Sequence, residues 1–494
     1  MVRLSELVAS LGGTCEADGT RDIVDVHIDS RRSEAGTLFA ALPGTKSDGA
    51  DHVPDAVGRG ATAVLSPRRL ELEGDFANWI HPEARRVAGK AAGIVYGRPT
   101  EDVPVIGITG TNGKTTVAHF LGELMEREGH HPAILGTVGH RLWGEVVPSS
   151  HTTPDATELQ RLCRRHRELG GDAVVMELSS HALDQERAAG LSLDVAVFTN
   201  LSADHLDYHK SLDAYAMAKE QIFKLLRSSG TAVINADDGC AERMVQAAIG
   251  CGARVVTFGI GSRADLRAYR LECAQEGTQL FLEGMGVPWT GLLLPLVGRH
   301  NVENALAALA AILSLGASPS RVLEGLATVS PPPGRLEPIQ TGGRGFRVFV
   351  DYAHTPDALE RVLDTLGELL RERAGSKQGR LLCVFGCGGE RDRDKRAPMG
   401  AAVAARADVA VVTSDNPRGE DPEAILNEVV GGMGAARGEV VVEVDRRTAI
   451  RRALHLARPG DLVLIAGKGH EEWQQLSNRR IPFDDRLVAG EELP

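Results

Sequence analysis

The chain has 494 residues, of which 43% are hydrophobic and 25% are charged, as in an ordinary globular protein. At roughly 150 residues per domain, this length predicts about three domains. Fifty-five Lys and Arg against 67 Asp and Glu leave a net charge of −12, which argues against a nucleic-acid-binding protein, because such proteins need a basic surface. No stretch approaches the roughly 20 apolar residues of a membrane span, and the N-terminus has no apolar run of signal-peptide length. We therefore expect a cytoplasmic protein without membrane insertion.

Two turn-rich stretches predict where the chain divides. The first lies at 96–104, and the second, Ser330-Pro-Pro-Pro-Gly-Arg335, has three prolines, which cannot continue a helix or a central strand. The predicted domains are residues 1–100, 101–332 and 333–494.

The first predicted domain carries the weakest functional signals. Asp29-Ser-Arg-Arg32 and the stretch at 42–49 contain turn-forming residues and hydroxyl groups, which suit a sugar or a phosphate. The same composition suits ordinary loops, so the residues alone do not decide between the two interpretations.

Strand patterns alternate with helical patterns through the rest of the chain. In the middle segment, a buried-strand pattern at 103–108 precedes a glycine-rich turn and then apolar residues at helical spacing. Further strands are expected at 173–176, 195–199, 232–235, 346–350, 381–385, 409–413 and 462–466. This alternation predicts an α/β fold with parallel sheets covered on both faces. Ligands of such sheets bind beyond the carboxyl ends of the strands, where we expect the functional residues.

The strongest motif is Thr109-Gly-Thr-Asn-Gly-Lys-Thr-Thr116, which lies between a predicted strand and a predicted helix. Its glycines let backbone amides approach phosphate oxygens, and the helix N-terminus adds partial positive charge. Lys114 can reach the β- and γ-phosphates of a nucleotide, and the Thr115 hydroxyl can ligate Mg²⁺. The alternative is an ordinary glycine turn, which the strand and helix context disfavours. Ile108 stands where the usual loop begins with Gly, so this is a variant phosphate loop.

Two further strand ends carry potential metal ligands. Glu177 follows one strand, and a second group follows the next strand: Asp204, His205, Asp207 and His209. Carboxylate oxygens and imidazole nitrogens at this edge predict a metal site beside the phosphate loop, although a single histidine taken alone fits a hydrogen-bonded loop residue better.

Lys219 falls on the apolar face of a predicted helix, four residues after Tyr215 and four before Phe223. A lysine in this position either extends its amine to solvent or is desolvated with a lowered pKa. A neutral amine near Mg²⁺ could react with CO₂ to form a carbamate, an additional anionic ligand.

Four strand-end sequences stand out in the last segment: Asp351-Tyr-Ala-His354, Gly386-Cys-Gly-Gly-Glu-Arg391, Asp415-Asn-Pro-Arg418 and Gly467-Lys-Gly-His-Glu471. Arg391 and Arg418 could each bind a carboxylate through two hydrogen bonds, or form surface salt bridges of little energetic weight. Their common place on one edge of one sheet favours a binding site.

These motifs, in this order and across nearly the whole chain, resemble the Mur ligase family of peptidoglycan synthesis. The matching stretches are TGTNGKTT, ELSSHAL, NLSADHLDYH, AKE, GRLE, DYAHTPDAL, DNPR and GKGHE. The resemblance implies three domains: a smaller N-terminal α/β domain that binds the UDP end of the substrate, a central P-loop ATPase-like parallel sheet, and a Rossmann-like C-terminal domain.

The resemblance also implies roles for individual residues, with Lys114, Glu177, His205 and Lys219 as the catalytic group. The implied ATP site comprises Gly110, Thr111, Asn112, Gly113, Lys114, Thr115, Thr116, Asn301, Arg335, Asp351 and His354. The implied metal ligands are Thr115, Glu177, His205 and Lys219 as a carbamate. The muramoyl-dipeptide substrate would be held by Ser30, Thr45, Lys46, Ser47, Thr152, Thr153, Ser179, Gln185 and Arg187. Diaminopimelate would be held by Arg391, Asp415, Asn416, Pro417, Arg418, Gly467 and Glu471.

The implied activity is ATP- and Mg²⁺-dependent ligation of meso-diaminopimelate to the D-Glu γ-carboxylate of UDP-MurNAc-L-Ala-D-Glu by a monomer, through an acyl phosphate. Alternatives are an L-lysine-adding ligase, a folylpolyglutamate synthetase-like ligase and a non-catalytic ATP-binding homologue. The Arg of DNPR disfavours lysine, whose terminal ammonium it would repel. Gly419 departs from the family pattern, which often has a hydroxyl residue there. A dehydrogenase is disfavoured because no G-x-G-x-x-G follows a predicted strand.

Overall fold

The computed structural model describes residues 1–494 apart from 17–18, 45–46, 72–73, 150, 262, 275–276, 373–378 and 435. The chain forms two compact units, and strands alternate with helices in both, which confirms the predicted α/β class. The first unit comprises Met1–Tyr269, Phe281–Thr290 and Glu303–Leu326, and the second comprises Arg270–Leu280, Gly291–Val302 and Ala327–Pro494. The three domain boundaries drawn from sequence remain a prediction. Within the described residues, no helix combines the length and the apolar character needed to cross a membrane.

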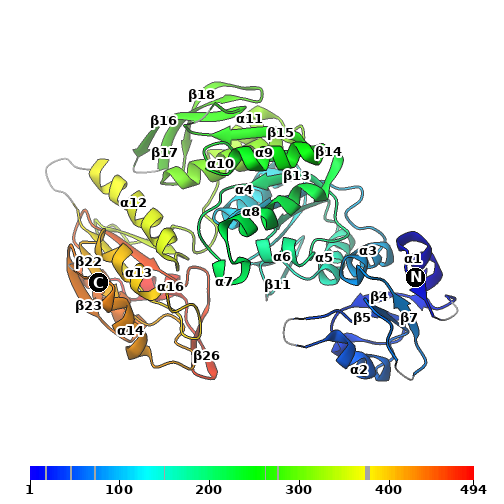
Figure 1. Ribbon diagram of the computed structural model, residues 1–494. Helices are drawn as coiled ribbons and strands as arrows, with labels where there is room; N and C mark the ends of the chain where they lie inside the picture. Colours follow the sequence, from blue (N-terminus) through cyan, green and yellow to red (C-terminus); the bar gives the residue numbers. More distant parts are fainter. Residues whose placement is uncertain are drawn as a thin grey trace. The chain divides into compact units, whose positions relative to one another are not determined.

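The N-terminal part of the first unit is a small sheet between two helical layers (Figure 1). Its elements are β1 (Val2–Arg3), α1 (Leu4–Leu11), β2 (Thr14–Cys15), β3 (Asp22–Ile23), β4 (Asp25–His27), β5 (Thr37–Ala40), α2 (Val53–Gly58), β6 (Ala63–Ser66), β7 (Ala77–Ile80) and α3 (Ala84–Val95). Strands β4, β5, β6 and β7 are parallel, and β2 pairs antiparallel with β7. Leu38 on β5 packs toward α1 and α3 and Phe39 toward α2, as the period-two geometry of a strand requires.

The larger sheet of the first unit holds the predicted phosphate loop. Its elements are β8 (Val105–Thr109), α4 (Lys114–Arg127), β9 (Pro132–Gly136), β10 (Gly139–Leu142), β11 (Glu145–Val147), α5 (Ala156–Glu168), β12 (Ala173–Glu177), α6 (Ser180–Asp184), β13 (Leu193–Phe198), α7 (Leu206–His209), α8 (Leu212–Glu220), β14 (Leu226–Asn235), α9 (Ala241–Gly250) and β15 (Arg254–Gly259). Strands β9, β12, β8, β13, β14 and β15 are parallel in this order, and β10 and β11 add an antiparallel edge. After β15 come β16 (Leu266–Ala274), β17 (Gly277–Gly284), β18 (Val287–Leu294), α10 (Arg299–Ser314) and α11 (Pro319–Leu326).

Register brings three strand ends together at one edge of this sheet. Glu177 at the end of β12 pairs with Ile108, and Phe198 at the end of β13 pairs with Thr109. Helix α4 starts directly beyond that edge, and its apolar residues Val117, Phe120, Leu121 and Leu124 are all buried, as their helical spacing predicts. The segment after each of the three strands is therefore placed beside the phosphate loop.

The C-terminal part of the second unit is a mostly parallel sheet. Its elements are β19 (Glu337–Ile339), β20 (Arg347–Asp351), α12 (Pro356–Glu372), β21 (Leu381–Phe385), α13 (Arg396–Ala404), β22 (Val409–Val412), α14 (Pro422–Gly431), β23 (Glu439–Val442), α15 (Arg446–Leu456), β24 (Leu462–Ala466), β25 (Trp473–Leu476), β26 (Arg479–Pro482) and α16 (Asp485–Glu491). The strand order is β19-β20-β24-β21-β22-β23, and all neighbours are parallel except β19 and β20.

Alternate residues of the central strand β21 enter two different cores. Cys383 and Phe385 pack with helices α12, α13 and α14, whereas Leu382 and Val384 pack with α15 and α16. A strand covered on both faces must be apolar throughout, which is why 381–385 reads as an uninterrupted apolar run. The loops after β20, β21, β22 and β24 leave this sheet at its carboxyl edge and carry the four polar motifs found in the sequence.

Candidate active site

The phosphate loop depends on two glycines in the left-handed region of backbone conformation. Gly110 has φ +151° and Gly113 has φ +88°. A Cβ atom on Gly110 would lie 1.9 Å from Thr199 Oγ1, and one on Gly113 would lie 2.3 Å from Asn304 Oδ1, so neither position has room for a side chain. Asn304, on helix α10, was not selected from sequence because it lies far along the chain from the motif.

The loop is also fixed by the segment that follows β13. The backbone amide of Thr111 donates to Asn200 O at 2.9 Å, and the amide of Asn112 donates to Asn200 Oδ1 at 2.9 Å. Thr199 Oγ1 donates to Asn112 O at 2.6 Å. The Lys114 ammonium donates to Gly110 O and Thr111 O, at 2.8 and 3.0 Å, and so lies across the loop.

A network of oxygen atoms lies between the loop and strand β12. The Thr115 hydroxyl donates to Glu177 Oε2 at 3.0 Å, and Glu177 is 2% exposed. Both the amide and the hydroxyl of Thr137 also donate to this carboxylate, at 2.9 and 3.0 Å, and the Thr137 and Thr152 hydroxyls are 3.1 Å apart. Thr137 follows strand β9 and had no motif to identify it.

The predicted dipeptide-binding residues meet beside this network. The Thr153 hydroxyl donates to Glu177 O at 2.8 Å and accepts from the backbone amide of Ser179 at 3.1 Å. The Arg187 guanidinium donates to Gln185 Oε1 at 2.7 Å and to Thr153 O at 3.2 Å. The structure therefore brings together Thr152, Thr153, Ser179, Gln185 and Arg187, which the sequence places up to 35 residues apart.

The histidines after β12 and β13 form an aromatic cluster. His205 lies 4.9 Å from His181 between ring centroids, and His209 accepts from or donates to Ser180 Oγ at 2.9 Å. Among the described side chains, no three His, Cys, Asp or Glu residues are grouped so that they could hold a metal ion. The Asp207 side chain lies outside the described residues. The assignment of His205 to a metal stays a prediction.

Lys219 is buried, which is one of the two outcomes that its place on the apolar face of helix α8 left open. The side chain is 1% exposed, and its nitrogen lies 4.3 Å from the centroid of the Tyr215 ring. Burial lowers the pKa of Lys219 well below its usual value, and the nearby Lys114 charge lowers it further. In the described part of the chain, no carboxylate lies within ion-pair distance of this amine. Burial therefore favours the neutral form of this amine.

In the second unit, the DNPR and GKGHE loops form one hydrogen-bonded cluster. Asn416 Nδ2 donates to Glu471 Oε2 at 2.9 Å, and the buried Lys468 donates to the same oxygen at 3.0 Å. Gln474 of strand β25 donates to Asp415 O at 2.7 Å. Pro417 is buried, and Gly467 adopts φ +118°, so the two loops are closely fitted. Lys468 lies within the GKGHE motif but was given no role of its own, and Gln474 was missed because a glutamine on a short strand carries no functional signal.

Arg418 and Arg391 place two guanidinium groups near each other. Arg418 has φ +53°, and its side chain donates to Gly389 O at 2.6 Å. Burial and the Arg391 charge lower the pKa of Arg418. Neighbouring guanidinium groups favour the binding of an anion such as a carboxylate.

A completely buried ion pair holds the two loops from behind. Arg446 and Asp485 are both 0% exposed and are 2.6 Å apart at the closest atoms. Arg446 also donates to Ala466 O at 2.9 Å and to Ser414 O at 3.5 Å, the residues that precede the GKGHE and DNPR loops. This pair was not predicted, because its partners are 39 residues apart and belong to neither motif.

Three of the predicted nucleotide-binding residues of the second unit, Arg335, Asp351 and His354, lie at or beside Tyr352. The Arg335 guanidinium lies 4.8 Å from the centroid of the Tyr352 ring, and burial raises the pKa of Asp351. His354 lies 4.6 Å from Tyr352 between ring centroids, and burial lowers its pKa. Asn301 is buried on helix α10 and donates to Val297 O at 2.9 Å. These four assignments to ATP stay predictions.

The residues predicted to bind UDP lie in the N-terminal part of the first unit. Ser30 is buried in a short 3-10 turn, and Ser47 is exposed in the loop after β5. Thr45 and Lys46, predicted for the same site, lie outside the described residues.

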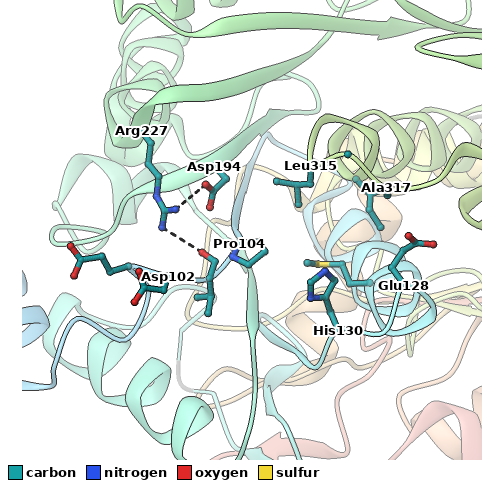
Figure 2. Close-up of a pocket in the computed structure, with 13 residues that line it drawn as sticks. Asp102, Pro104, Glu128, His130, Asp194, Arg227, Leu315 and Ala317 are labelled. Carbon is teal, nitrogen blue, oxygen red and sulfur yellow. Dashed lines mark hydrogen bonds and ion pairs between the residues drawn. The ribbon is translucent and has the colours of Figure 1, made fainter.

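A separate pocket of about 490 Å³ lies at the opposite end of the large sheet (Figure 2). Val103 and Pro104, just before strand β8, and Asp194 at the start of β13 line it, whereas the phosphate loop follows the other end of β8. Asp194 is paired with Arg227 at 3.0 Å, as the dashed line shows. The pocket is therefore distinct from the phosphate loop.

Comparison with known proteins agrees with this geometry. The chain matches three family descriptions: Mur ligase family, catalytic domain, over residues 22–128; Mur ligase middle domain over 108–312; and Mur ligase, glutamate ligase domain, over 334–469. The chain belongs to the Mur ligase family, a class of ATP-dependent amide ligases, and has its three-domain α/β fold.

Similar proteins share one name, UDP-N-acetylmuramoyl-L-alanyl-D-glutamate–2,6-diaminopimelate ligase. That of Syntrophomonas wolfei is 43% identical over 499 residues, which cover 100% of this chain and 99% of the relative. That of Chromobacterium violaceum is 44% identical over 474 residues, 95% of this chain and 94% of the relative. A solved structure of the same name has a TM-score of 0.73 at 33% identity and covers 100% of this chain and 98% of its own.

Proposed function

We propose that this protein joins meso-diaminopimelate to the D-Glu γ-carboxylate of UDP-MurNAc-L-Ala-D-Glu in an ATP-dependent reaction of peptidoglycan precursor synthesis. We also propose that the protein acts as a monomer in the cytoplasm. Similarity over the full chain to ligases named for the addition of 2,6-diaminopimelate supports the proposed reaction. The single observation that carries it is the charge pattern of the second unit, where two carboxylates and two guanidinium groups occupy one edge of one sheet.

This charge pattern matches the far end of diaminopimelate. That end is an amino acid with one carboxylate and one ammonium, while the other end supplies the amine that reacts. Arg418 and Arg391 would bind the carboxylate, and Asp415 and Glu471 would bind the ammonium. L-lysine has no carboxylate at its far end, so it would leave both guanidinium groups unpaired and bring its ammonium near them.

The residues of the first unit suit activation of the D-Glu carboxylate. A carboxylate is a poor acyl donor, so its oxygen attacks the γ-phosphorus of ATP, ADP leaves, and an acyl phosphate forms. Backbone amides of the Gly110 loop and the Lys114 ammonium would hold the transferred phosphate, and Arg187 with Thr153 would hold the substrate carboxylate in line. The amine of diaminopimelate then attacks the acyl carbon, phosphate leaves, and the amine proton is lost.

The oxygen network fits Mg²⁺. A hard cation prefers oxygen ligands, and the Thr115 hydroxyl and the buried Glu177 carboxylate present oxygens beside the phosphate loop. Bound Mg²⁺ would neutralise charge on the phosphate oxygens. The neutral amine of Lys219 can add CO₂ and release a proton, which yields a carbamate with anionic oxygens. We propose His205 and carbamylated Lys219 as further metal contacts.

Phosphate release tests the proposal directly. Enzyme, ATP, Mg²⁺ and UDP-MurNAc-L-Ala-D-Glu are mixed with meso-diaminopimelate or with L-lysine in parallel, and we expect release at least about 100-fold faster with diaminopimelate. Equal or faster release with lysine would identify the lysine-adding version and contradict the role of Arg418. No release with either amino acid would indicate a different acceptor or a non-catalytic homologue.

A further inference from the structure

A fully buried lysine lies behind the residues assigned to diaminopimelate. The Lys468 side chain is 0% exposed, and its nitrogen lies 3.0 Å from Glu471 Oε2, 3.2 Å from Asn416 Oδ1 and 3.7 Å from Asp415 Oδ1. Desolvating an ammonium is costly unless it is paired, so the three contacts together account for its burial. Lys468 thus touches three of the residues that the proposed function uses, although it is not one of them.

The contacts leave an acceptor oxygen of Glu471 available to a substrate. Glu471 Oε2 accepts from Lys468 and Asn416, while its other oxygen accepts no hydrogen bond within the described residues. Asp415 Oδ1 also has no hydrogen-bond donor in the described part of the chain, but it is buried and lies 3.7 Å from the Lys468 nitrogen, so Asp415 would act on a substrate ammonium through its charge. A substrate ammonium has three N–H groups to offer, so the two carboxylates form the complementary half of an ammonium site.

Lys468 offsets the mutual repulsion of the two carboxylates. Asp415 and Glu471 both approach the same nitrogen, so without it two like charges would face each other in a poorly solvated site. Repulsion would then drive the two side chains apart. Arg446, buried behind the loops, acts electrostatically on both carboxylates but touches neither.

We propose that Lys468 is a positioning and selectivity residue, which holds Asp415 and Glu471 in the orientation that binds the far ammonium group of the incoming amino acid. This inference rests on the proposed function and deepens it. It predicts that Lys468 contributes to recognition of that amino group more than to binding of ATP or the nucleotide-sugar peptide.

The test compares two amino acids that differ only in this group. 2-Aminopimelate keeps both carboxylates of meso-diaminopimelate and lacks one amino group. We expect the wild-type enzyme to prefer diaminopimelate by about 100-fold or more in kcat/KM. Lys468→Met and Lys468→Gln should each reduce this ratio at least tenfold, mainly by raising KM for diaminopimelate, with KM for ATP little changed. Lys468→Arg, which keeps the charge, should restore part of the ratio.

Arg380→Gln is the matched control. Arg380 pairs with Asp461 at 2.8 Å, at the opposite end of strands β21 and β24, so its loss should lower stability without changing the ratio. If Lys468→Met fails to fold, Lys468→Gln, which is the more conservative substitution, provides the measurement of the ratio.

The outcomes separate the two proposals. If the wild-type enzyme ligates neither amino acid, the proposed function fails and the role of Lys468 falls with it. If the wild-type enzyme shows the preference and the Met and Gln variants retain it, only the role of Lys468 is overturned. Equal losses of kcat/KM for both amino acids would also overturn it, because they would indicate a general structural defect.

Discussion

Two buried lysines, one in each compact unit, have opposite surroundings. Lys219 is 1% exposed and faces the ring of Tyr215, with no carboxylate within ion-pair distance in the described residues. Lys468 is 0% exposed and lies 3.0 Å from Glu471 and 3.7 Å from Asp415. The two side chains are equally removed from water, so burial alone cannot explain a difference in their roles.

The neighbouring charges explain the difference. Burial and the positive charge of Lys114 lower the pKa of Lys219, which favours a neutral, nucleophilic amine. Lys468 lies within 3.7 Å of two carboxylates, and these contacts fix the position of both acidic side chains. In this protein the partners of a buried lysine, rather than the burial itself, decide whether its amine is reactive or positions the neighbouring side chains.

The second unit depends most strongly on its buried charges, and the largest expected effect is on its stability. Arg446→Met leaves Asp485 buried without a partner, which should lower the free energy of unfolding by about 3–5 kcal/mol. Denaturant unfolding followed by tryptophan fluorescence measures this change. The double variant Arg446→Met/Asp485→Leu should recover most of the loss. A double variant as unstable as the single one would show that the ion pair itself is not the cause.

The first unit depends on Lys219 for chemistry. Lys219→Met should lower the rate of ligation at least about 10²-fold, because it removes the proposed Lys219 carbamate, whose anionic oxygens would contact the metal beside the transferred phosphate. Single-turnover phosphate release measures the chemical step. Lys224→Met, which removes an exposed lysine five residues further on, is the control and should keep the wild-type rate. An unchanged rate in Lys219→Met would contradict a reactive role for this amine.

The smallest expected effect is a difference between the two lysines in how their replacement changes stability with pH. The folded pKa of Lys219 lies below the value of 10.5 expected in the unfolded chain, so unfolding takes up a proton and wild-type stability rises with pH in the window between the two values. In CO₂-free buffer at pH 7, Lys219→Met should therefore be more stable than the wild type by about 1 kcal/mol or more, and the difference should shrink toward pH 10.

Lys468→Met should change stability in the opposite direction in the same series of pH values. It leaves two carboxylates without their cation, so it should be less stable than the wild type at pH 7. The free energies come from urea unfolding at each pH. A Lys219→Met difference that does not vary with pH would mean that the amine is charged in the folded protein.

Local sequence predicted the parts of the site that depend on local geometry. The phosphate loop followed from two glycines between a strand and a helix, and the place of Lys219 on the apolar face of its helix followed from its spacing to Tyr215 and Phe223. The strands that were predicted were placed to within one or two residues, except β14, which begins six residues before the predicted start, at Leu226.

Contacts between distant segments could not be predicted in this way. Thr137 meets Glu177 only because β9 and β12 are neighbours, and Arg446 meets Asp485 only because α15 and α16 pack on the same face of the sheet. Lys468 belonged to a recognised motif, but its burial against Asn416 depends on a pairing of two loops 52 residues apart. Such groups carry no periodicity and no characteristic spacing, so only the fold identifies them.

The most direct test of the contrast between the two lysines is ¹³C NMR with ¹³C-labelled bicarbonate at neutral pH. A neutral amine adds CO₂, whereas an ammonium ion has no free electron pair with which to do so. The wild-type protein should show a carbamate carbon signal, which disappears in Lys219→Met and persists in Lys468→Gln. A signal that survives Lys219→Met but is lost in Lys468→Gln would contradict the roles assigned to the two residues, and so would the absence of any carbamate signal.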